Sequence, residues 1–282
     1  MAIRPRNALL GVAACVVALA LVWLGAFHVG FVRRADQSAF LQFYNLKAHG
    51  IVEWLVQHLI WPFLPTHYAF VAPVPIVLAL VRGRRRVVLA MGVIILGANA
   101  STELLKALLT APRPAELLYG FAPVPPGSWP SGHATAVMSL VLVSVLAVPA
   151  RVRPTAAALG ATLAIAVGYS VVAAGLHYPS DVLGGFLMAG AWTLAAVAGL
   201  ILAERRWPVA RASSGAVSLR AVLGAPGAVL LGGGLLGVIL LIARPHHVIS
   251  YASVHQAFML EAVAIAALGL AVSTAVLLSV RR

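Results

Sequence analysis

Residues 175–181 read Gly-Leu-His-Tyr-Pro-Ser-Asp and separate two long apolar segments of the chain. Tyr178 precedes a proline, which makes the helical conformation unfavourable for it. Pro179 itself suits the first position of a new helix. We therefore expect a tight turn between two helices, with His177 and Asp181 both on it. In such a turn Asp181 can accept a hydrogen bond from one imidazole nitrogen of His177, which leaves the other nitrogen to act as a base or nucleophile.

Apolar segments of similar length recur along the whole chain of 282 residues, which is 62% hydrophobic and only 10% charged. Its mean hydropathy of +0.99 indicates a composition far more apolar than that of a typical soluble domain. A helix needs about 20 apolar residues to cross the hydrocarbon core of a bilayer. We therefore expect an all-α, polytopic membrane helix bundle of about eight spans. The spans are predicted at about 8–32, 66–81, 87–110, 133–149, 154–176, 181–202, 221–243 and 257–280.

Basic residues are distributed unevenly among the connections between these segments, and this asymmetry predicts the orientation of the chain. Most of the 20 Lys and Arg residues fall at the two ends of the chain and in every second loop. Because cytoplasmic loops are enriched in Lys and Arg, both termini are expected in the cytoplasm. Attraction to an anionic inner leaflet explains the formal charge of +13, and nucleic-acid binding is not expected. The residues on this predicted cytoplasmic side are Arg4, Arg6, Arg82, Arg84, Arg85, Arg86, Arg151, Arg153, Arg205, Arg206, Arg211, Arg220, Arg281 and Arg282.

The sequence divides into three regions. Residues 1–86 hold the first two spans and, at about 51–61, a helix with one apolar face and two Trp residues that suits the outer membrane interface. Residues 87–202 hold four spans and the polar clusters that carry chemistry. Residues 203–282 begin with a basic cytoplasmic loop and continue with two additional C-terminal spans.

A first polar cluster lies near the outer end of the segment 87–110. Glu103 and Lys106 are spaced to share one face of a helix, and Arg113 follows shortly after. Lysine supplies a point charge and arginine a planar fork of donors, so together they suit a phosphate group. Glu103 is expected to pair with Lys106 and hold it in place. The alternative is that the two cations only extend from the end of a span to the membrane surface.

A second cluster, Pro130-Ser131-Gly132-His133, opens the segment 133–149. Gly132 allows a ligand to approach the backbone closely, and the N-terminus of the following helix presents unpaired N–H groups to an anion. The hydroxyl of Ser131 adds a donor, and His133 lies at the same edge. A simple helix cap by Ser131 is the alternative, but it leaves His133 unexplained.

Together these residues resemble the three signature motifs of the type 2 phosphatidic acid phosphatase (PAP2) family. The matching patterns are Lys106-x6-Arg113-Pro114, Pro130-Ser131-Gly132-His133 and Ser170-x6-His177-x3-Asp181. The resemblance is close over residues 87–202 and looser over the first two spans. It implies a six-helix PAP2-like core, to which the two C-terminal spans are additions.

The resemblance implies a metal-independent hydrolase of phosphomonoesters or pyrophosphates that uses no cofactor. His177 would attack phosphorus and form a phosphohistidine, with Asp181 orienting its ring. His133 would protonate the leaving oxygen and later activate water. The residues that would hold the phosphoryl oxygens are Lys106, Arg113, Ser131, Gly132 and Ser170.

The substrate that the resemblance implies is a membrane lipid phosphate, such as an undecaprenyl pyrophosphate-like or phosphatidic acid-like molecule. With the orientation predicted from the basic loops, the active site would lie on the periplasmic side of a bacterial inner membrane. The expected partners are thus the lipid bilayer and its phosphate-bearing lipids. The sequence leaves the oligomeric state open.

One position departs from the family's pattern. The third motif of the family begins Ser-Arg, whereas Ser170 is followed by Val171 in this chain. The missing arginine normally contacts the phosphate, and losing one such donor typically costs about 10²–10³-fold in rate. Replacement cations on the same predicted side are Arg33, Arg34 and Arg244. Two alternatives to a phosphatase therefore remain, namely a lipid phosphotransferase of the same fold and a non-catalytic lipid-phosphate binder or transporter.

Overall fold

A computed structural model describes residues 5–46, 50–109, 124–208 and 218–280, and within these ranges the chain forms helices and no strand. Helices are expected because an apolar segment in a bilayer must satisfy its backbone hydrogen bonds internally. The predicted all-α bundle is confirmed. The α-helices are α1 (Pro5–His28), α2 (Gly30–Leu46), α3 (Gly50–Ile60), α4 (Pro65–Val71), α5 (Pro73–Val81), α6 (Arg85–Leu108), α7 (Gly132–Ala147), α8 (Arg153–Ala173), α9 (Pro179–Arg206), α10 (Leu219–Ala243), α11 (Pro245–Val254) and α12 (Gln256–Ser279), and short 3₁₀ turns lie at η1 (Trp61–Phe63) and η2 (Ala150–Val152).

Within the described ranges, six helices are long and apolar enough to cross a membrane, namely α1, α6, α8 with η2, α9, α10 and α12. The other two predicted spans are less simple. α7 is apolar but only 16 residues long. The segment predicted at 66–81 belongs to a pair of helical segments, Gly50–Phe63 and Pro65–Val81. The direction of the chain bends by 65° between them. Proline removes a backbone donor and crowds the preceding turn, which explains a break at Pro65.

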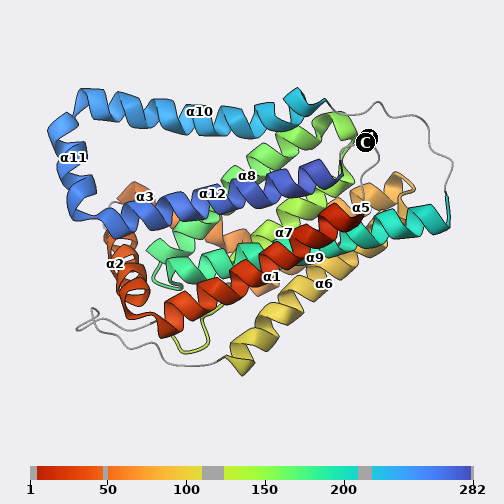
Figure 1. Cartoon of the computed structure of the whole chain (residues 1–282), viewed down its shortest axis with the longest axis horizontal. Helices are drawn as coiled ribbons and strands as arrows, with labels where there is room; N and C mark the ends of the chain where they lie inside the picture. The colour runs from red at the N-terminus through yellow and green to blue at the C-terminus, as the bar shows by residue number, and fades with distance from the viewer. Residues whose placement is uncertain (1–4, 47–49, 110–123, 209–217, 281–282) are drawn as a thin grey trace.

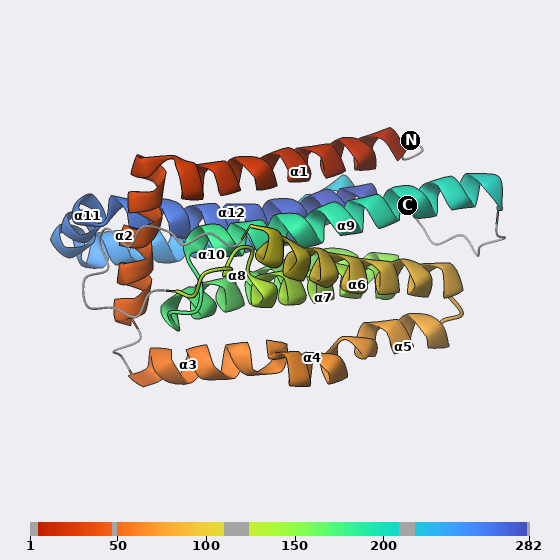
Figure 2. The ribbon, with the colours of Figure 1, turned by 90° about the horizontal axis from the view of Figure 1, so that it is seen from below.

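The helix predicted at the membrane interface over 51–61 is therefore the first half of a broken, span-like pair. Figure 2 shows α3, α4 and α5 in a row along one side of the bundle. Val56 and Ile60 of α3 are buried, so the helix packs onto the bundle through one face. The side chains of Ile51 and Trp54, in the same helix, are exposed.

The long helices run along a common axis, and α9 lies inside the bundle (Figure 1). It contacts α1, α6, α7 and α12, and most of its side chains are buried as far as Ile201. α2 crosses one end of the bundle steeply to α1 (Figure 2). The start of α1 and the end of α12 lie at the opposite end (Figure 2). The bundle thus has an end crossed by α2 and an end where the chain begins and finishes.

The two C-terminal spans differ in how they relate to this bundle. α12 contacts α2, α8 and α9, and the Tyr169 hydroxyl of α8 donates a hydrogen bond of 2.7 Å to the Ala262 carbonyl of α12. Of the residues of α10, only Val222 and Pro226 are buried. α12 is therefore part of the bundle's core, whereas α10 exposes an apolar surface at its edge (Figure 1).

α7 and α9 approach each other closely where the second polar cluster lies. A Cβ atom added to Gly185 of α9 would lie 2.7 Å from the carbonyl oxygen of Ser131 and 2.9 Å from the amide nitrogen of Thr135. Both neighbours are backbone atoms, which cannot rotate away as a flexible side chain does. Gly185 therefore permits the contact that brings the N-terminus of α7 onto α9.

Replacing Gly185 with alanine is expected to destabilise the protein by about 1–3 kcal/mol, because the added methyl group forces the two helices apart. The measurement is thermal unfolding of the purified protein in detergent. Gly199→Ala is the matched control, since no atom lies within 4 Å of a Cβ placed at Gly199 of the same helix. That control should be neutral or stabilising by up to about 1 kcal/mol. Equal unfolding temperatures for the two variants would contradict the close contact.

Candidate active site

The turn between α8 and α9 brings His177 and Asp181 together, as the sequence predicts. Gly175 follows α8 with a φ of +79°, a backbone conformation that L side chains rarely adopt. Nδ1 of His177 lies 3.4 Å from Oδ2 of Asp181, and the N–H of Tyr178 donates to the same oxygen over 3.1 Å. Asp181 is fully buried and His177 is 7% exposed. A fixed carboxylate therefore engages Nδ1, and Nε2 is the ring nitrogen that does not contact Asp181.

The N-terminus of α7 is joined directly to this turn. The backbone N–H of Ser131 donates to the carbonyl of Asp181 over 2.9 Å. The Ser131 hydroxyl oxygen accepts from the N–H of Ala134 over 3.3 Å, so Ser131 is an N-cap, as one alternative held. An accepting hydroxyl still has a proton to donate, and the cap therefore does not consume its donor. The first turns of α7 and α9 form one connected unit.

Polar contacts from α6 hold the same unit. The hydroxyls of Thr102 and Thr135 lie 3.0 Å apart, and the Thr135 hydroxyl also donates to the carbonyl of Ser131 over 2.9 Å. All three side chains are buried. Buried hydroxyls that satisfy one another in this way fix the register between helices. The end of α6 that carries Lys106 is thus held beside the start of α7.

His133 faces His177 across the site. Their ring centroids lie 5.9 Å apart, with the ring planes at 68°. Nε2 of His133 is buried and has no hydrogen-bond partner among the described residues. A buried imidazole nitrogen without a partner loses hydration free energy, so such an atom is expected where a bound ligand supplies the missing partner.

Lys106 brings a positive charge to the same place. Its Nζ lies 2.7 Å from Oε1 of Glu103, which confirms the predicted pair. A Cβ atom added to Gly132 would lie 3.0 Å from Nζ of Lys106. The ammonium group therefore sits over the N-terminal residue of α7, where the helix presents N–H groups and the positive end of its dipole. This combination of a cation and a helix N-terminus favours an anion.

The structure places the remaining residues that were predicted to bind phosphate in different surroundings. Arg113 lies outside the described residues. Ser170 is buried, and its hydroxyl donates to the Ala166 carbonyl of its own helix over 2.8 Å. Val171 is fully buried in the main hydrophobic cluster of the bundle, so apolar packing fills the position of the family's arginine. Arg33 is one of the cations suggested to replace the family's arginine. It lies on α2, one helical turn before Asp36, and Asp36 contacts Ser180 in the first turn of α9.

Asp36 of α2 is a site residue that the sequence reasoning missed. Its Oδ1 accepts from the N–H of Ser180 over 3.0 Å, and its Oδ2 accepts from the Ser180 hydroxyl over 2.6 Å. Asp36 is 1% exposed. A carboxylate at a helix N-terminus satisfies N–H groups that have no partner within the helix and complements its dipole. α2 therefore holds the first turn of α9 next to Asp181. The available signal was the rarity of acidic residues, since the chain has only seven.

We expect Asp36→Asn to lower kcat about 10²-fold with little change in KM, because a small displacement of the His177 turn misplaces the reacting groups without removing a substrate contact. The measurement is steady-state phosphate release from a lipid phosphate. Glu53→Gln is the control, since it neutralises an exposed carboxylate of α3. A rise in KM at unchanged kcat would show that Asp36 acts on substrate binding and not on the position of the turn.

Residues 87–202 match the family model of the PAP2 superfamily. The matched range contains α7, α8 and most of α6 and α9, and hence all three motifs, while α2 with Asp36 and α12 lie outside it. No curated protein and no solved structure matches the chain.

Proposed function

Because the chain belongs to the PAP2 superfamily through residues 87–202, we propose that it hydrolyses a membrane lipid phosphate through a phosphohistidine on His177. Members of this superfamily are generally phosphatases, which assigns lipid phosphate hydrolysis at a coarse level. Our proposal adds three points to this family assignment: the substrate class, the covalent intermediate and the independence from metal ions. The observation that carries them is the His177–Asp181 contact facing the unpartnered Nε2 of His133.

The proposed reaction has two steps. Nε2 of His177 attacks the phosphorus atom, a P–N bond forms, and the bond to the leaving lipid oxygen breaks. His133 gives its proton to that oxygen. His133 then takes a proton from water, the water oxygen attacks phosphorus, and the P–N bond breaks to release phosphate and restore His177. Asp181 stabilises the positive charge that develops on His177.

In this proposal, Lys106 and the N-terminus of α7 hold the phosphoryl oxygens. Lys106 lies above Gly132, and the first N–H groups of α7 point out of the helix at the same place. Such preorganised donors stabilise the charge that develops on the phosphoryl group in the transition state. The proposed metal-independent reaction uses these protein groups for that stabilisation.

The position of the site supports a lipid substrate. His133, His177 and Lys106 gather at the ends of helices long or apolar enough to lie in a bilayer. A lipid headgroup at the membrane surface meets them at that depth while its chains remain in the hydrocarbon layer. With the basic end of the bundle in the cytoplasm, the site faces the periplasm of a bacterial inner membrane. Undecaprenyl pyrophosphate-like and phosphatidic acid-like molecules are the two substrate classes to test.

The test is a phosphate-release panel in detergent micelles with a chelator present, using a prenyl diphosphate and phosphatidic acid. We expect wild-type protein to release phosphate from at least one of them. We also expect Val171→Arg to raise the rate by about 10²-fold, since one added donor to the phosphate has about that effect. Val171→Met controls for the size of the side chain in this buried position. Absence of release from every substrate by the wild type would overturn the proposal.

The buried Val171 favours one alternative, a protein that binds lipid phosphate without turning it over. That function predicts binding of the lipid by the wild type, no release of phosphate, and activity created by Val171→Arg. A phosphotransferase differs again, because it would consume the donor lipid with little free phosphate until water replaces the acceptor. The same panel, with donor and free phosphate both quantified, separates the three functions.

A further inference from the structure

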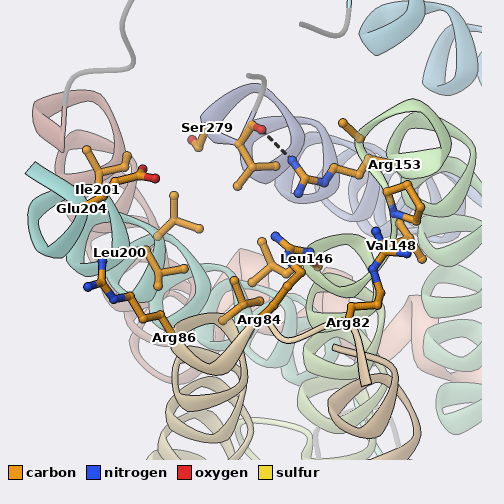
Figure 3. A pocket seen from close by; sticks show the side chains of 15 residues that line it. Arg82, Arg84, Arg86, Leu146, Val148, Arg153, Leu200, Ile201, Glu204 and Ser279 are labelled. Atoms are coloured by element: carbon orange, nitrogen blue, oxygen red, sulfur yellow. Dashed lines mark hydrogen bonds between the residues drawn. The ribbon is translucent and has the colours of Figure 1, made fainter. Parts of the chain in front are cut away.

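A pocket of about 280 Å³ lies at the end of the bundle opposite the candidate active site (Figure 3). Arg82 and Arg84 reach it from the turn between α5 and α6, Arg86 from the first turn of α6, and Arg153 from the start of α8. Among the described residues that line the pocket, Glu204 of α9 is the only acidic one. The lining therefore carries a clear excess of positive charge.

This pocket is separate from the candidate active site. α9 carries Asp181 in its first turn and Glu204 near its last. At the rise of an α-helix these two residues lie about 35 Å apart along the axis, which is about the thickness of the hydrocarbon core of a bilayer. A ligand in the pocket would therefore lie at the other membrane face from the two histidines.

The arginines also have a structural task. Nη1 of Arg84 donates to the Leu146 carbonyl over 2.5 Å, and Nη1 of Arg86 donates to the Trp207 carbonyl over 2.6 Å. Nη1 of Arg153 donates to the Val280 carbonyl over 2.8 Å. These carbonyls end α7, α9 and α12, so the arginines satisfy helix C-termini and complement their dipoles.

Two of the arginines stand at the rim. Arg82 and Arg86 are exposed, whereas Arg84, Arg153 and Glu204 are half-buried deeper in the pocket. No hydrogen bond joins the Arg82 side chain to another described residue. Figure 3 shows Arg82, Arg84 and Arg86 on one side of the pocket and Arg153 across from them. Planar forks arranged around a small volume match the geometry of a phosphate group, whose oxygens accept bidentate bonds.

Apart from Glu204 and Ser279, the rest of the lining is apolar. It consists of Val87, Leu146, Val148, Val197, Leu200, Ile201 and Val280, with Pro149 and Ala150. A soluble anion would gain nothing from this wall, whereas the glycerol and first methylene groups of a lipid would. The volume is near the lower limit for ligand pockets, so it suits a headgroup and not a whole lipid.

We propose that this pocket binds the phosphate group of an anionic ligand, which in the membrane is the headgroup of an anionic phospholipid of the cytoplasmic leaflet. The arginines bind the phosphate oxygens, and the apolar wall receives the part of the lipid next to the headgroup. The shared chemistry is the phosphate, and a free phosphate ion is the second source. The proposal is independent of catalysis at the other end of the bundle.

The test uses full-length protein in a neutral detergent and native mass spectrometry with titrated phosphatidylglycerol, a phosphodiester that lacks the terminal phosphate of the proposed substrates. The pocket variant is Arg82→Gln with Arg86→Gln. The matched control is Arg85→Gln with Arg151→Gln, which removes the same charge at the same end from exposed residues that do not line the pocket. A second arm adds inorganic phosphate as competitor, and a third measures Lys106→Gln to register binding at the candidate active site.

We expect the pocket variant to lose about tenfold or more in affinity, since each charge-assisted hydrogen bond contributes at least that factor. The control variant and Lys106→Gln should stay within about twofold, well below that factor. Displacement by inorganic phosphate would show that the phosphate alone suffices for binding, and retention of the lipid would assign the site to the lipid headgroup. Equal losses in the pocket and control variants would mean diffuse charge attraction and overturn the proposal, as would loss of binding in Lys106→Gln. If the double variant unfolds early, Arg82→Gln alone decides the result.

Discussion

His177→Ala should reduce phosphate release to the background rate, a loss of about 10⁶-fold in kcat, as when the nucleophile of another covalent enzyme is removed. His177 is the ring whose Nδ1 is held by the buried Asp181 and whose second nitrogen is left to attack phosphorus. Alanine removes the only atom that can form the P–N bond in the proposed reaction. The measurement is phosphate release from the best substrate of the panel, with thermal unfolding to verify the fold.

The matched control for this experiment is His246→Ala, which removes an exposed histidine of α11 at the same end of the bundle. It should leave the rate unchanged. His133→Ala should fall between the two, because a general acid and base contributes about 10²–10⁴-fold. If His177→Ala kept more activity than His133→Ala, the two roles would have to be exchanged or the nucleophile sought elsewhere.

Asp181→Asn should lower kcat by about 10³–10⁴-fold, although the substitution barely changes the shape of the side chain. Asp181 accepts from both His177 and the N–H of Tyr178, and it is fully buried. An asparagine oxygen at the position of Oδ2 can still accept both bonds, but the neutral amide carries no charge to stabilise the protonated ring. The measurement is kcat together with the amplitude of the first turnover.

The companion variant Asp181→Ala tests whether the effect is chemical or structural. It should lose a similar amount of activity and also unfold at a lower temperature, because a buried N–H is left without its acceptor at a cost of about 1–3 kcal/mol. Asp181→Asn should keep most of the stability. Activity of Asp181→Asn within about tenfold of the wild type would mean that the carboxylate does not orient the nucleophile.

Local sequence signals predicted the parts of the site that depend on short-range geometry. A proline at a helix start placed His177 and Asp181 on one turn, and helical spacing placed Glu103 beside Lys106. The apolar lengths predicted the helices themselves. The bend at Pro65 was not predicted, because an apolar run of suitable length does not reveal where prolines divide it into two directions.

Contacts between distant parts of the chain were beyond these signals. Asp36 and Ser180 meet across 144 positions of sequence, and nothing local to either residue indicates the other. The buried position of Val171 follows from the packing of α8 within the bundle. Arg82, Arg84, Arg86 and Arg153 were predicted on one membrane side, but their convergence around one pocket required the helices to be placed in space.

The most direct test of the central claim is rapid acid-free quenching of His133→Ala during turnover of a labelled lipid phosphate, followed by mass spectrometry of the histidine-containing peptides. Without His133 the first step is slower because the leaving oxygen is not protonated, but the covalent intermediate that does form should persist because no base activates water. We predict one phosphoryl group on His177, lost on mild acid treatment and absent from His177→Ala. Steady release of phosphate by the wild type with no label on His177 in either protein would contradict the account.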